Sequence, residues 1–473
     1  MTPAARPTVR TRFAPSPTGR LHLGNVRIAV FNWLFARHHG GVFVLRVEDT
    51  DVERNVPGAE GALMDDLRWL GLAWDEGPDV GGPFGPYRQS ERAAAHDQAL
   101  ATLLERGRAY RCFCPADEGG EDRRYPGRCR ALPAGEAERR SGAGEPHVVR
   151  FRTPREDVVQ VRDEVRGVIS FPAKDLDDFV LRRRDGRATY NFAVVADDAA
   201  MRISHVIRGA GHLSNAPKHA LLFDALDHPR PCFVHLPNLL APDGGKLSKR
   251  RGAQGAGELR AAGMLPAAIV NYLSLLGWSH PDEREILTLE ELVASVSLDR
   301  VRAAEMAHDP DKLRWVATQH MARLSLEEVA AGVAPFVDGS RFPLSGDALR
   351  AAVGAIRTRL AAFSEVNEHL AAAFPEEGPA WDAVRADLAA DAEAVTLLRA
   401  LAERLRTVDP WAPDEIGREV RAAGAAAGVK GRALFRPVRR ALFAAETGPD
   451  LAGLTAAVGR EEVLRRLGRV PGV

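Results

Sequence analysis

The chain lacks the features that would place it in a membrane, outside the cell or in a disulfide-bonded scaffold. Its 473 residues include only four cysteines. No apolar run approaches the roughly 20 residues of a membrane-spanning helix, and residues 1–7 contain no apolar signal core. Four thiols in a chain of this length argue for a reducing compartment. We therefore expect a cytoplasmic protein with no membrane partner.

The chain also lacks an excess of charge of either sign. Lys and Arg together number 64, and so do Asp and Glu. Balanced charge does not exclude an RNA partner, because RNA requires a local basic face rather than a net positive charge. Arginine-rich stretches at 123–130, 182–187 and 436–440 are candidates for such faces. A solvated helix face or turn also explains such a run, and composition alone favours that explanation.

A strand–loop–helix–strand pattern lies near the N-terminus. A β-prone run over Val9–Phe13 leads into a loop rich in Pro and Gly, and apolar residues then recur at i, i+4, i+7 and i+8 from Val26. The helical pattern ends at Gly40-Gly41, and a second apolar strand begins at Val42. This is the length expected of a right-handed βαβ unit. The N-terminus of its helix offers unpaired N–H groups and a positive dipole end to a phosphate.

Two short motifs far apart in the chain together predict an ATP site. His22-Leu23-Gly24-Asn25 begins the predicted helix, and Lys246-Leu247-Ser248-Lys249-Arg250 lies in a loop near the middle. An imidazole and two lysines can contact the same phosphates, and Gly24 allows a close approach to adenine because it has no Cβ. The motifs resemble the HIGH and KMSKS signatures of class I aminoacyl-tRNA synthetases. The predicted ATP-binding residues are His22, Gly24, Lys246, Ser248 and Lys249.

The position of His22 argues against a histidine that merely caps a helix. The flanking segments 14–19 and 48–51 both follow predicted strands. The carboxyl ends of parallel strands are where doubly wound sheets bind their ligands. We therefore expect these segments to surround a substrate.

Nearly the whole chain resembles the bacterial-type glutamyl-tRNA synthetases, and its C-terminal third does so mainly in helical pattern and length. The resemblance is strongest in segments 12–24, 46–51, 75–90, 190–192, 205–209 and 246–250. It implies a ligase that uses ATP and Mg²⁺ to convert L-glutamate into glutamyl-adenylate. The glutamyl group would then pass to the 3′-terminal adenosine of tRNA-Glu, and such enzymes generally need bound tRNA before they activate glutamate.

The resemblance also implies an α/β multidomain fold and a division of the chain. A Rossmann-like parallel-sheet catalytic domain would comprise 1–110 and 208–265, with the lysine motif in its second half. An α+β acceptor-arm insertion would occupy 111–207. A stem-contact domain would follow at 266–324, and all-α C-terminal anticodon-binding domains at 325–473. We expect the protein to be a monomer.

The pocket for the amino acid follows from the same resemblance. A substrate with two carboxylates and one ammonium needs two cationic contacts and one anionic contact. Arg12 and Arg208 would bind the carboxylates, and Glu48 would bind the ammonium. The remaining members of the pocket are Ala14, Ser16 and Tyr190. For the two arginines the alternative is a structural ion pair.

The catalytic residues implied by the resemblance are His22, Lys246 and Lys249. Negative charge builds on the α-phosphate of ATP as glutamate attacks it. A positioned imidazole and two lysines would stabilise that charge, and Mg²⁺ would bridge the phosphates.

Four residues of the expected insertion form a candidate zinc site. They are Cys112, Cys114, Tyr125 and Cys129. Some members of the family hold one structural Zn²⁺ through such a set, and others lack it. Three thiolates and one oxygen would complete a tetrahedral site. Against zinc, a phenolate is a rare ligand and the intervening loop is short.

Two arginines of the helical region are candidates for reading the anticodon. Discriminating members of the family carry an arginine that screens the third anticodon base, and Arg359 matches that position, with Arg357 beside it. An arginine can stack on or hydrogen-bond to an unstacked base. The alternative is a contact with phosphate or solvent, without base choice. The sequence thus leaves open whether the enzyme also charges tRNA-Gln.

The chain departs from the family pattern beside one pocket residue. Ala210-Gly211 follow Arg208-Gly209 where acidic residues are usual. This departure leaves a non-catalytic RNA-binding paralogue as an alternative, although intact His22 and lysines argue against it. Truncated relatives that glutamylate a tRNA base lack a helical C-terminal part, and glutaminyl enzymes usually carry a β-barrel there, so neither fits the chain.

Overall fold

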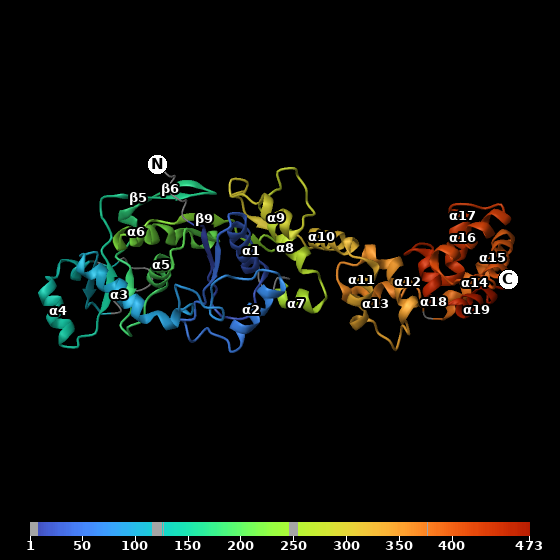
Figure 1. The fold of residues 1–473 in the computed structure, drawn as a ribbon, viewed down its shortest axis with the longest axis horizontal. Helices are drawn as coiled ribbons and strands as arrows, with labels where there is room; N and C mark the ends of the chain where they lie inside the picture. The colour runs from blue at the N-terminus through green and yellow to red at the C-terminus, as the bar shows by residue number, and fades with distance from the viewer. Residues whose placement is uncertain (1–7, 116–124, 126, 246–253, 376) are drawn as a thin grey trace. The chain divides into compact units, whose positions relative to one another are not determined.

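A computed structural model of the chain describes residues 8–115, 125, 127–245, 254–375 and 377–473. The chain divides into two compact units, each with its own core. Unit 1 comprises Met1–Glu258 and Val270–Asp309, and unit 2 comprises Leu259–Ile269 and Pro310–Val473. Figure 1 colours the chain from blue at the N-terminus, which belongs to unit 1, to red at the C-terminus, which belongs to unit 2.

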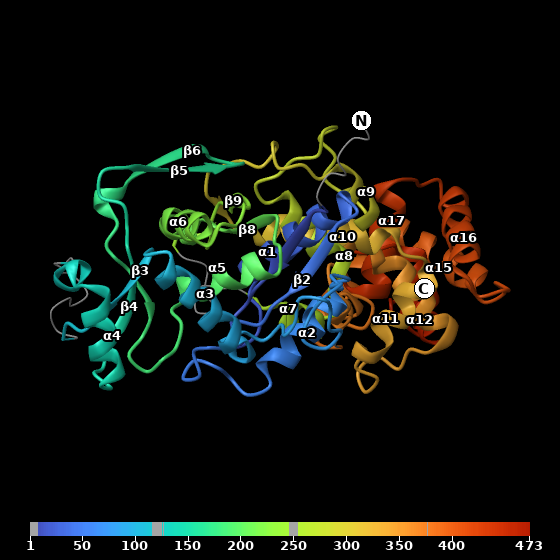
Figure 2. The same cartoon turned by 60° about the vertical axis from the view of Figure 1, so that its left-hand side comes forward.

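The predicted βαβ unit opens unit 1. Strands β1 (Arg10–Phe13) and β2 (Val42–Leu45) pair in parallel, and helix α1 (Leu23–His38) connects them. The side chains spaced from Val26 are buried, as the periodicity predicts. The helix ends before Gly40, whose φ of 58° favours glycine. Figure 2 shows β2 and α1 near one another in the blue part of the chain.

A four-stranded sheet continues the α/β layer in the order β6-β5-β9-β8. Strands β8 (His205–Gly209) and β9 (Cys232–Leu236) are parallel, and α6 (Ala216–Leu226) lies between them in sequence. Strand β8 runs beside β1 in the same direction, because the Ser204 amide donates to the Arg10 carbonyl at 3.0 Å and the Arg12 side chain reaches the Ile207 carbonyl. The carboxyl ends of these parallel strands therefore meet at one edge.

The segment 111–207 contributes to two sheets. Strands β5 (Val158–Asp163) and β6 (Gly167–Pro172) form a hairpin that joins β9 at Asp163. A separate antiparallel sheet contains β3 (Ala109–Cys112), β4 (Val148–Phe151) and β7 (Val180–Arg182) in that order. Part of the expected insertion thus extends the sheet of β8 and β9. The boundaries of the insertion stay a prediction.

The remaining regular elements up to β11 connect or cover these sheets. They are α2 (Ala59–Trp69), α3 (Ala93–Glu105), α4 (Ala134–Gly142), α5 (Tyr190–Ala200), β10 (Leu239–Leu240), α7 (Ala256–Ala261), α8 (Pro266–Leu275), α9 (Leu289–Ser295) and β11 (Met306–Ala307). Strands β10 and β11 pair in parallel. The core shared by α3, α5, α6 and the sheets is apolar, with Phe192, Leu222 and Phe223 almost fully buried.

Beyond Pro310 the described residues form helices and no strand. These helices are α10 (Pro310–Arg323), α11 (Leu326–Val333), α12 (Gly346–Ile356), α13 (Val366–Leu370), α14 (Pro379–Ala390), α15 (Ala392–Leu405), α16 (Pro413–Ala426), α17 (Arg432–Phe443), α18 (Leu451–Val458) and α19 (Arg460–Gly468). Ser325 and Glu328 close a capping box at the start of α11. Val353, Leu398 and Leu442 belong to one buried cluster. The predicted helical C-terminal region is thus confirmed.

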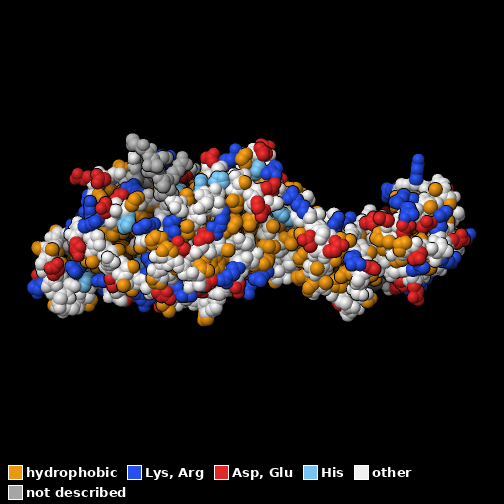
Figure 3. Space-filling view, viewed as in Figure 1, with side chains coloured by type: hydrophobic (Ala, Val, Ile, Leu, Met, Phe, Trp, Pro, Cys, Tyr) orange, Lys and Arg blue, Asp and Glu red, His pale blue; other side chains and the backbone are white. Residues whose placement is uncertain are grey.

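Acidic and basic side chains are interspersed on the visible face of each unit in Figure 3, as expected from equal numbers of both kinds. Among the helices that the structure describes, we find none with the length and apolar character needed to cross a membrane.

Candidate active site

The pocket residues predicted from three separate segments lie at the carboxyl edge of the parallel strands. The Glu48 amide donates to the Pro15 carbonyl at 2.9 Å, which joins the loop after β2 to the loop after β1. Arg12, Glu48 and Arg208 are 4%, 8% and 5% exposed. They lie close enough for the charges of Arg12 and Arg208, and of Arg12 and Glu48, to influence one another. Within the loop after β1, Ala14 is half-buried and Ser16 is exposed.

Asp198 on α5 is at the centre of a buried ion-pair network. Its Oδ1 accepts from Arg46 Nη1 at 2.7 Å and from Arg12 Nε at 3.2 Å. Arg46 Nη2 also donates to Glu48 Oε1 at 3.0 Å. Burial raises the pKa of Glu48, and Arg46 and Arg12 only partly offset this. Arg12 therefore does form a structural ion pair, and that pair places its guanidinium beside Glu48.

Arg208 is held differently, by two histidines. Its Nε donates to His235 Nε2, and its Nη1 donates to His219 Nδ1, both at 3.0 Å. Among the described residues its buried Nη2 has no hydrogen-bond partner. Burial lowers the pKa of Arg208 to about 10, so the guanidinium is still charged at neutral pH. A buried cationic donor without a partner is costly unless a ligand completes it.

Tyr190 and His212 lie near Arg208 and are more exposed than it. Tyr190 begins α5 and is 39% exposed, and its hydroxyl lies 3.1 Å from His212 Nδ1. His212 belongs to the 3₁₀ helix Ala210–Asn215, which contains the departure from the family pattern. A Cβ at Gly211 would meet only the Asn238 side chain, at 4.0 Å, so the backbone leaves room for a larger side chain there.

His22 is the N-cap of α1. Its Nδ1 accepts a hydrogen bond from the Asn25 amide at 3.3 Å. An imidazole that accepts through Nδ1 is neutral and carries its proton on Nε2, so Nε2 is a hydrogen-bond donor. A Cβ at residue 24 would lie 3.0 Å from the His22 ring. His22 can therefore cap the helix through Nδ1 and still donate to a phosphate through Nε2. The absence of a Cβ at Gly24 also leaves space for the His22 ring.

The chain segment after the lysine motif docks directly on the His22 motif. Gly255 forms an antiparallel bridge with His22, and the Ala256 amide donates to the Leu21 carbonyl at 3.2 Å. A Cβ at Gly257 would overlap the end of the Arg20 side chain. The predicted residues Lys246, Ser248 and Lys249 lie outside the described residues. The structure nevertheless brings the motif's downstream flank to the predicted ATP site.

The four candidate zinc ligands cluster away from this pocket, at the end of β3. The Sγ atoms of Cys112, Cys114 and Cys129 all lie within 4.8 Å of one another, and Tyr125 Oη is 3.2 Å from Cys112 Sγ. Two thiolates on a tetrahedral zinc would be about 3.8 Å apart, given Zn–S bonds of about 2.3 Å. The Cys114 and Cys129 sulfurs are 3.6 Å apart, so the cluster fits such an ion.

The environment of the thiols also suits a cation. Burial opposes ionisation of Cys112, but hydrogen bonds from Tyr125, the Cys114 backbone and Arg150 outweigh it, so the pKa of the Cys112 thiol is lowered. Burial raises the pKa of Cys114 to about 11. Neighbouring thiols do not easily ionise together, because their negative charges repel each other. A bound metal cation offsets that repulsion.

The two predicted anticodon readers belong to unit 2. They lie in the 3₁₀ turn Arg357–Arg359 that follows α12. Arg357 is half-buried and its Nη1 donates to the Leu324 carbonyl at 3.5 Å. Arg359 is exposed and its Nη2 donates to the Gly448 carbonyl at 3.1 Å. The expected helix is therefore a tighter turn, which leaves Arg359 accessible.

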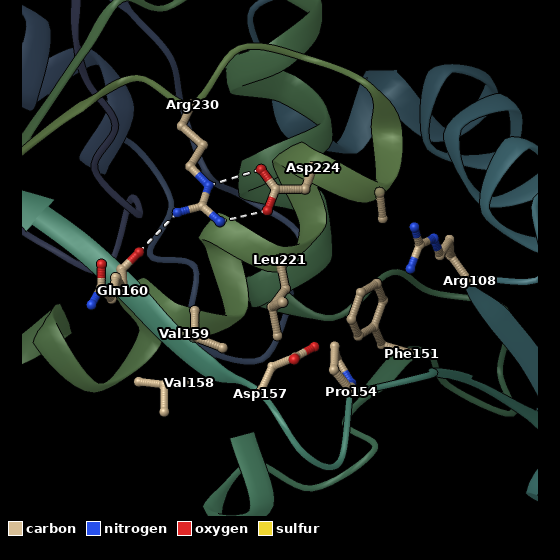
Figure 4. A pocket seen from close by; sticks show the side chains of 11 residues that line it. Arg108, Phe151, Pro154, Asp157, Val158, Val159, Gln160, Leu221, Asp224 and Arg230 are labelled. Atoms are coloured by element: carbon tan, nitrogen blue, oxygen red, sulfur yellow. Dashed lines mark hydrogen bonds and ion pairs between the residues drawn. The ribbon is translucent and has the colours of Figure 1, made fainter. Parts of the chain in front are cut away.

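A cavity of about 450 Å³ in unit 1 does not coincide with any predicted site. It lies between β5 and α6. Figure 4 shows Arg230 on one side of it, bonded to Asp224 and to the Gln160 backbone. Arg230 and Asp224 on that side are bonded to each other, whereas the buried cluster around Arg208 retains a donor without a partner among the described residues. The chemistry therefore points to the pocket around Arg208.

Sequence reasoning missed the residues that hold the pocket arginines. They are Arg46, Asp163, Asp198, His219 and His235. The signals for them were weak: Asp198 lies in an apolar helical pattern, and His235 stands between Val234 and Leu236 in an apolar strand. A polar side chain at an apolar position must find a partner when buried, but the sequence does not say which.

Two protein families match the chain in order. The family described as "tRNA synthetases class I (E and Q), catalytic domain" matches residues 8–315, and the family described as "Anticodon binding domain" matches residues 328–471. Together with the parallel-sheet core and the His22 motif at its carboxyl edge, these matches define a class I tRNA synthetase with a helical C-terminal anticodon-binding region.

Relatives that match nearly the full length of the chain identify its family within this class. The chain is 43% identical over 485 residues to the glutamate--tRNA ligase of Desulforudis audaxviator, covering 98% of this chain and 96% of that protein. It is 42% identical over 467 residues to that of Thermus thermophilus, covering 98% and 99%. A crystal structure of a glutamate tRNA ligase from Elizabethkingia meningosepticum in complex with its amino acid has a TM-score of 0.86 at 32% identity, covering 98% and 99%. The chain belongs to the glutamate--tRNA ligase family, as its motifs predicted.

Proposed function

We propose that this chain ligates L-glutamate to tRNA-Glu in two steps at the pocket of unit 1. Glutamate is activated by ATP to glutamyl-adenylate and then transferred to the 3′-terminal adenosine. The observation that carries the proposal is the presence of two buried guanidinium groups, Arg12 and Arg208, and one buried carboxylate, Glu48, whose charges influence one another. Two cations and one anion match the two carboxylates and the ammonium of glutamate.

In this proposal each pocket residue has one role. Arg208 binds a substrate carboxylate through its unsatisfied Nη2, and Arg12 binds the other. Glu48 accepts from the ammonium, whose charge favours the ionised carboxylate against the effect of burial. Tyr190 and Ser16 add neutral hydrogen bonds, and Ala14 lines the pocket.

The phosphate side of the site relies on His22 and the lysine motif. The neutral His22 ring donates from Nε2 at the N-terminus of α1, where the helix dipole also favours negative charge. In this proposal Lys246 and Lys249 stabilise the charge that develops on the α-phosphate, Ser248 contacts ATP, and Gly24 faces adenine. Mg²⁺ supplies charge neutralisation on the ATP phosphates when bound.

Aminoacylation with purified tRNA-Glu tests the proposal. Glutamate, glutamine and aspartate are each offered with ATP and Mg²⁺, and pyrophosphate exchange is followed with and without tRNA. We expect charging with glutamate only, and exchange that depends on tRNA. Charging that prefers aspartate or glutamine would refute the assignment of the pocket.

We further propose that the cysteine cluster holds one structural Zn²⁺. The support is the convergence of three sulfurs and one phenolic oxygen around a volume of tetrahedral size. Three protein thiolates would bind the ion tightly and fix the end of β3. We expect elemental analysis of chelator-free protein to find close to one zinc per chain, and Cys112→Ser to release it. The control is Cys232→Ser, because Cys232 contacts Glu164 instead. Wild-type protein without zinc would contradict the proposal.

The division of the chain into domains, a monomeric state and a cytoplasmic location complete the proposal. The two family matches end at 315 and begin at 328, which brackets the proposed boundary between 324 and 325. Mass determination by light scattering in dilute solution is expected to give the 51.3 kDa of a single chain.

A further inference from the structure

The buried arginines of the pocket differ in the kind of partner that holds them. Arg12 and Arg46 are paired with the carboxylate of Asp198, and Arg46 also with that of Glu48. None of the ion pairs found in the described part of the chain involves Arg208. Its Nε and Nη1 are instead bonded to His235 and His219, and its guanidinium lies 5.8 Å from the Phe233 ring. All of these contacts are with uncharged groups.

The hydrogen bonds fix the proton on each imidazole. A guanidinium can only donate, so His235 Nε2 and His219 Nδ1 must both be acceptors. His235 therefore carries its proton on Nδ1, 2.6 Å from Asp163 Oδ2. His219 carries its proton on Nε2, 3.0 Å from Asn191 Oδ1. The two rings are neutral, and they are different tautomers. Asp163 orients the His235 ring, and Asn191 orients the His219 ring.

We propose that His219 and His235 are positioning residues that orient Arg208 with neutral acceptors, so that its positive charge selects a substrate carboxylate over the corresponding amide. The inference rests on the proposed function and deepens it. A carboxylate in either position would orient the guanidinium equally well but would cancel much of its charge. A neutral acceptor leaves the charge in place and leaves Nη2 for the ligand.

The surroundings of the two rings agree with this role. Burial lowers the pKa of His219 well below its usual value and also lowers that of His235, and the nearby charges of Arg208 and Arg12 oppose protonation of His219. The charges of Arg12, Asp198 and Glu48 act on Arg208. The two carboxylates among them are already bonded to Arg12 and Arg46. Asp163 is separated from Arg208 by the His235 ring.

A matched pair of variants at residue 219 separates charge from shape. Asn and Asp both place an oxygen near the position of histidine Nδ1 and differ by one charge. We expect the KM for glutamate to be on the order of 10- to 100-fold higher in H219D than in H219N, because an adjacent carboxylate offsets a nearby cation strongly in a buried site. The preference in kcat/KM for glutamate over glutamine is expected to fall by a similar factor. The KM for ATP is expected to be alike in both variants, which a general structural defect would not allow.

A second pair covers the case in which H219D does not fold. Gln at residue 235 keeps a neutral acceptor near the Nε2 position, whereas Leu removes it. H235L is expected to raise the glutamate KM at least tenfold more than H235Q, with the ATP KM again alike. Equal glutamate KM values within both pairs would overturn the proposal.

Calorimetric binding of glutamate distinguishes failure of this inference from failure of the proposed function. Wild-type protein that binds glutamate but does not charge tRNA-Glu would refute the function, and weaker binding by H219D than by H219N would still support the histidine pair. Normal charging by wild type with equal binding in both variants would refute only the histidine pair. Wild-type protein that neither binds nor charges glutamate would refute both.

Discussion

Other buried arginines of unit 1 are also paired with carboxylates. Arg10 bonds Glu76 through two hydrogen bonds of 2.8 and 2.9 Å, and Arg92 Nε donates to Asp197 Oδ1 at 2.6 Å. A guanidinium remains charged when buried, so loss of its partner leaves an uncompensated charge. Stability of unit 1 should therefore depend on individual carboxylates.

Asp197 allows this dependence to be measured. Burial opposes its ionisation, but His96, Arg46 and Arg92 outweigh burial and lower its pKa to about 2 from 3.8. A lowered carboxyl pKa contributes stability that is present above about pH 4 and is lost as the pH falls toward 2. Asp197→Asn is therefore expected to reduce the free energy of unfolding at pH 7 by roughly 2–3 kcal/mol.

Urea unfolding of wild type and variant at pH 7 and pH 3 provides the test. The difference between the two proteins is expected to shrink by roughly 1 kcal/mol at pH 3, because the Asp197 carboxyl group is then largely protonated in the unfolded wild-type chain but still mostly ionised in the folded protein. Asp224→Asn is the control, since its pair with Arg230 is exposed at the surface and such pairs contribute about 0–1 kcal/mol. A difference that stays constant between the two pH values would contradict this account of Asp197.

At the scale of elements, β1 and β2 begin their pairing next to Gly41, where there is no space for a side chain. The Val42 amide donates to the Val9 carbonyl at 2.8 Å. A Cβ at Gly41 would lie 2.3 Å from that same carbonyl oxygen. Only glycine therefore lets the strand after α1 start its pairing with β1, and both strands carry pocket loops at their opposite ends.

Gly41→Ala is expected to destabilise the βαβ unit. The backbone of Val9 would have to move, and overpacking of this kind costs about 1–3 kcal/mol. Gly61→Ala in α2 is the matched control, because nothing lies within 4 Å of its added Cβ and alanine is favoured over glycine in a helix by about 0.5–1 kcal/mol. Thermal unfolding followed by circular dichroism is expected to move in opposite directions for the two variants. A Gly41→Ala protein as stable as wild type would show that the strands can separate there without cost.

The sequence predicts the strands, the helix and the pocket arginines but not the partners of those arginines. Apolar periodicity is local, so the βαβ unit follows from residues 9–47 alone. The assignment of Arg12, Glu48 and Arg208 to the pocket came from the resemblance to the family, and it agrees with the rule that parallel sheets bind ligands at the carboxyl ends of their strands. Asp198 and His235 come from α5 and β9, and their pairing with Arg12 and Arg208 depends on tertiary contacts that leave no local pattern.

At the scale of the whole molecule, the proposed amino-acid pocket and the predicted anticodon readers belong to different units. The pocket residues belong to unit 1, whereas Arg357 and Arg359 belong to unit 2. Substitutions in unit 2 are therefore expected to change which tRNA is accepted without altering the KM for glutamate.

Arg359→Gln tests this separation. We expect the variant to charge tRNA-Gln with glutamate while losing little activity on tRNA-Glu, because the substitution removes the exposed guanidinium that we propose screens one anticodon base. Arg357→Gln, at the second predicted reader, is expected to have the smaller effect, since Arg357 is half-buried and bonded to the Leu324 carbonyl whereas Arg359 is exposed. Both variants are compared with wild type in charging assays on the two purified tRNAs. Comparable charging of both tRNAs by wild type would mean that the enzyme does not discriminate.

The proton in the short hydrogen bond between His235 and Asp163 should make ligand binding in the pocket visible by proton NMR spectroscopy. The proton on His235 Nδ1 lies in a 2.6 Å hydrogen bond between two fully buried side chains. A proton in such a bond exchanges slowly with water and resonates far downfield in a proton NMR spectrum. When a carboxylate binds Arg208, electron density in the intervening imidazole shifts and the resonance shifts with it. Occupancy of the amino-acid pocket can thus be followed without a label, a turnover or a second substrate.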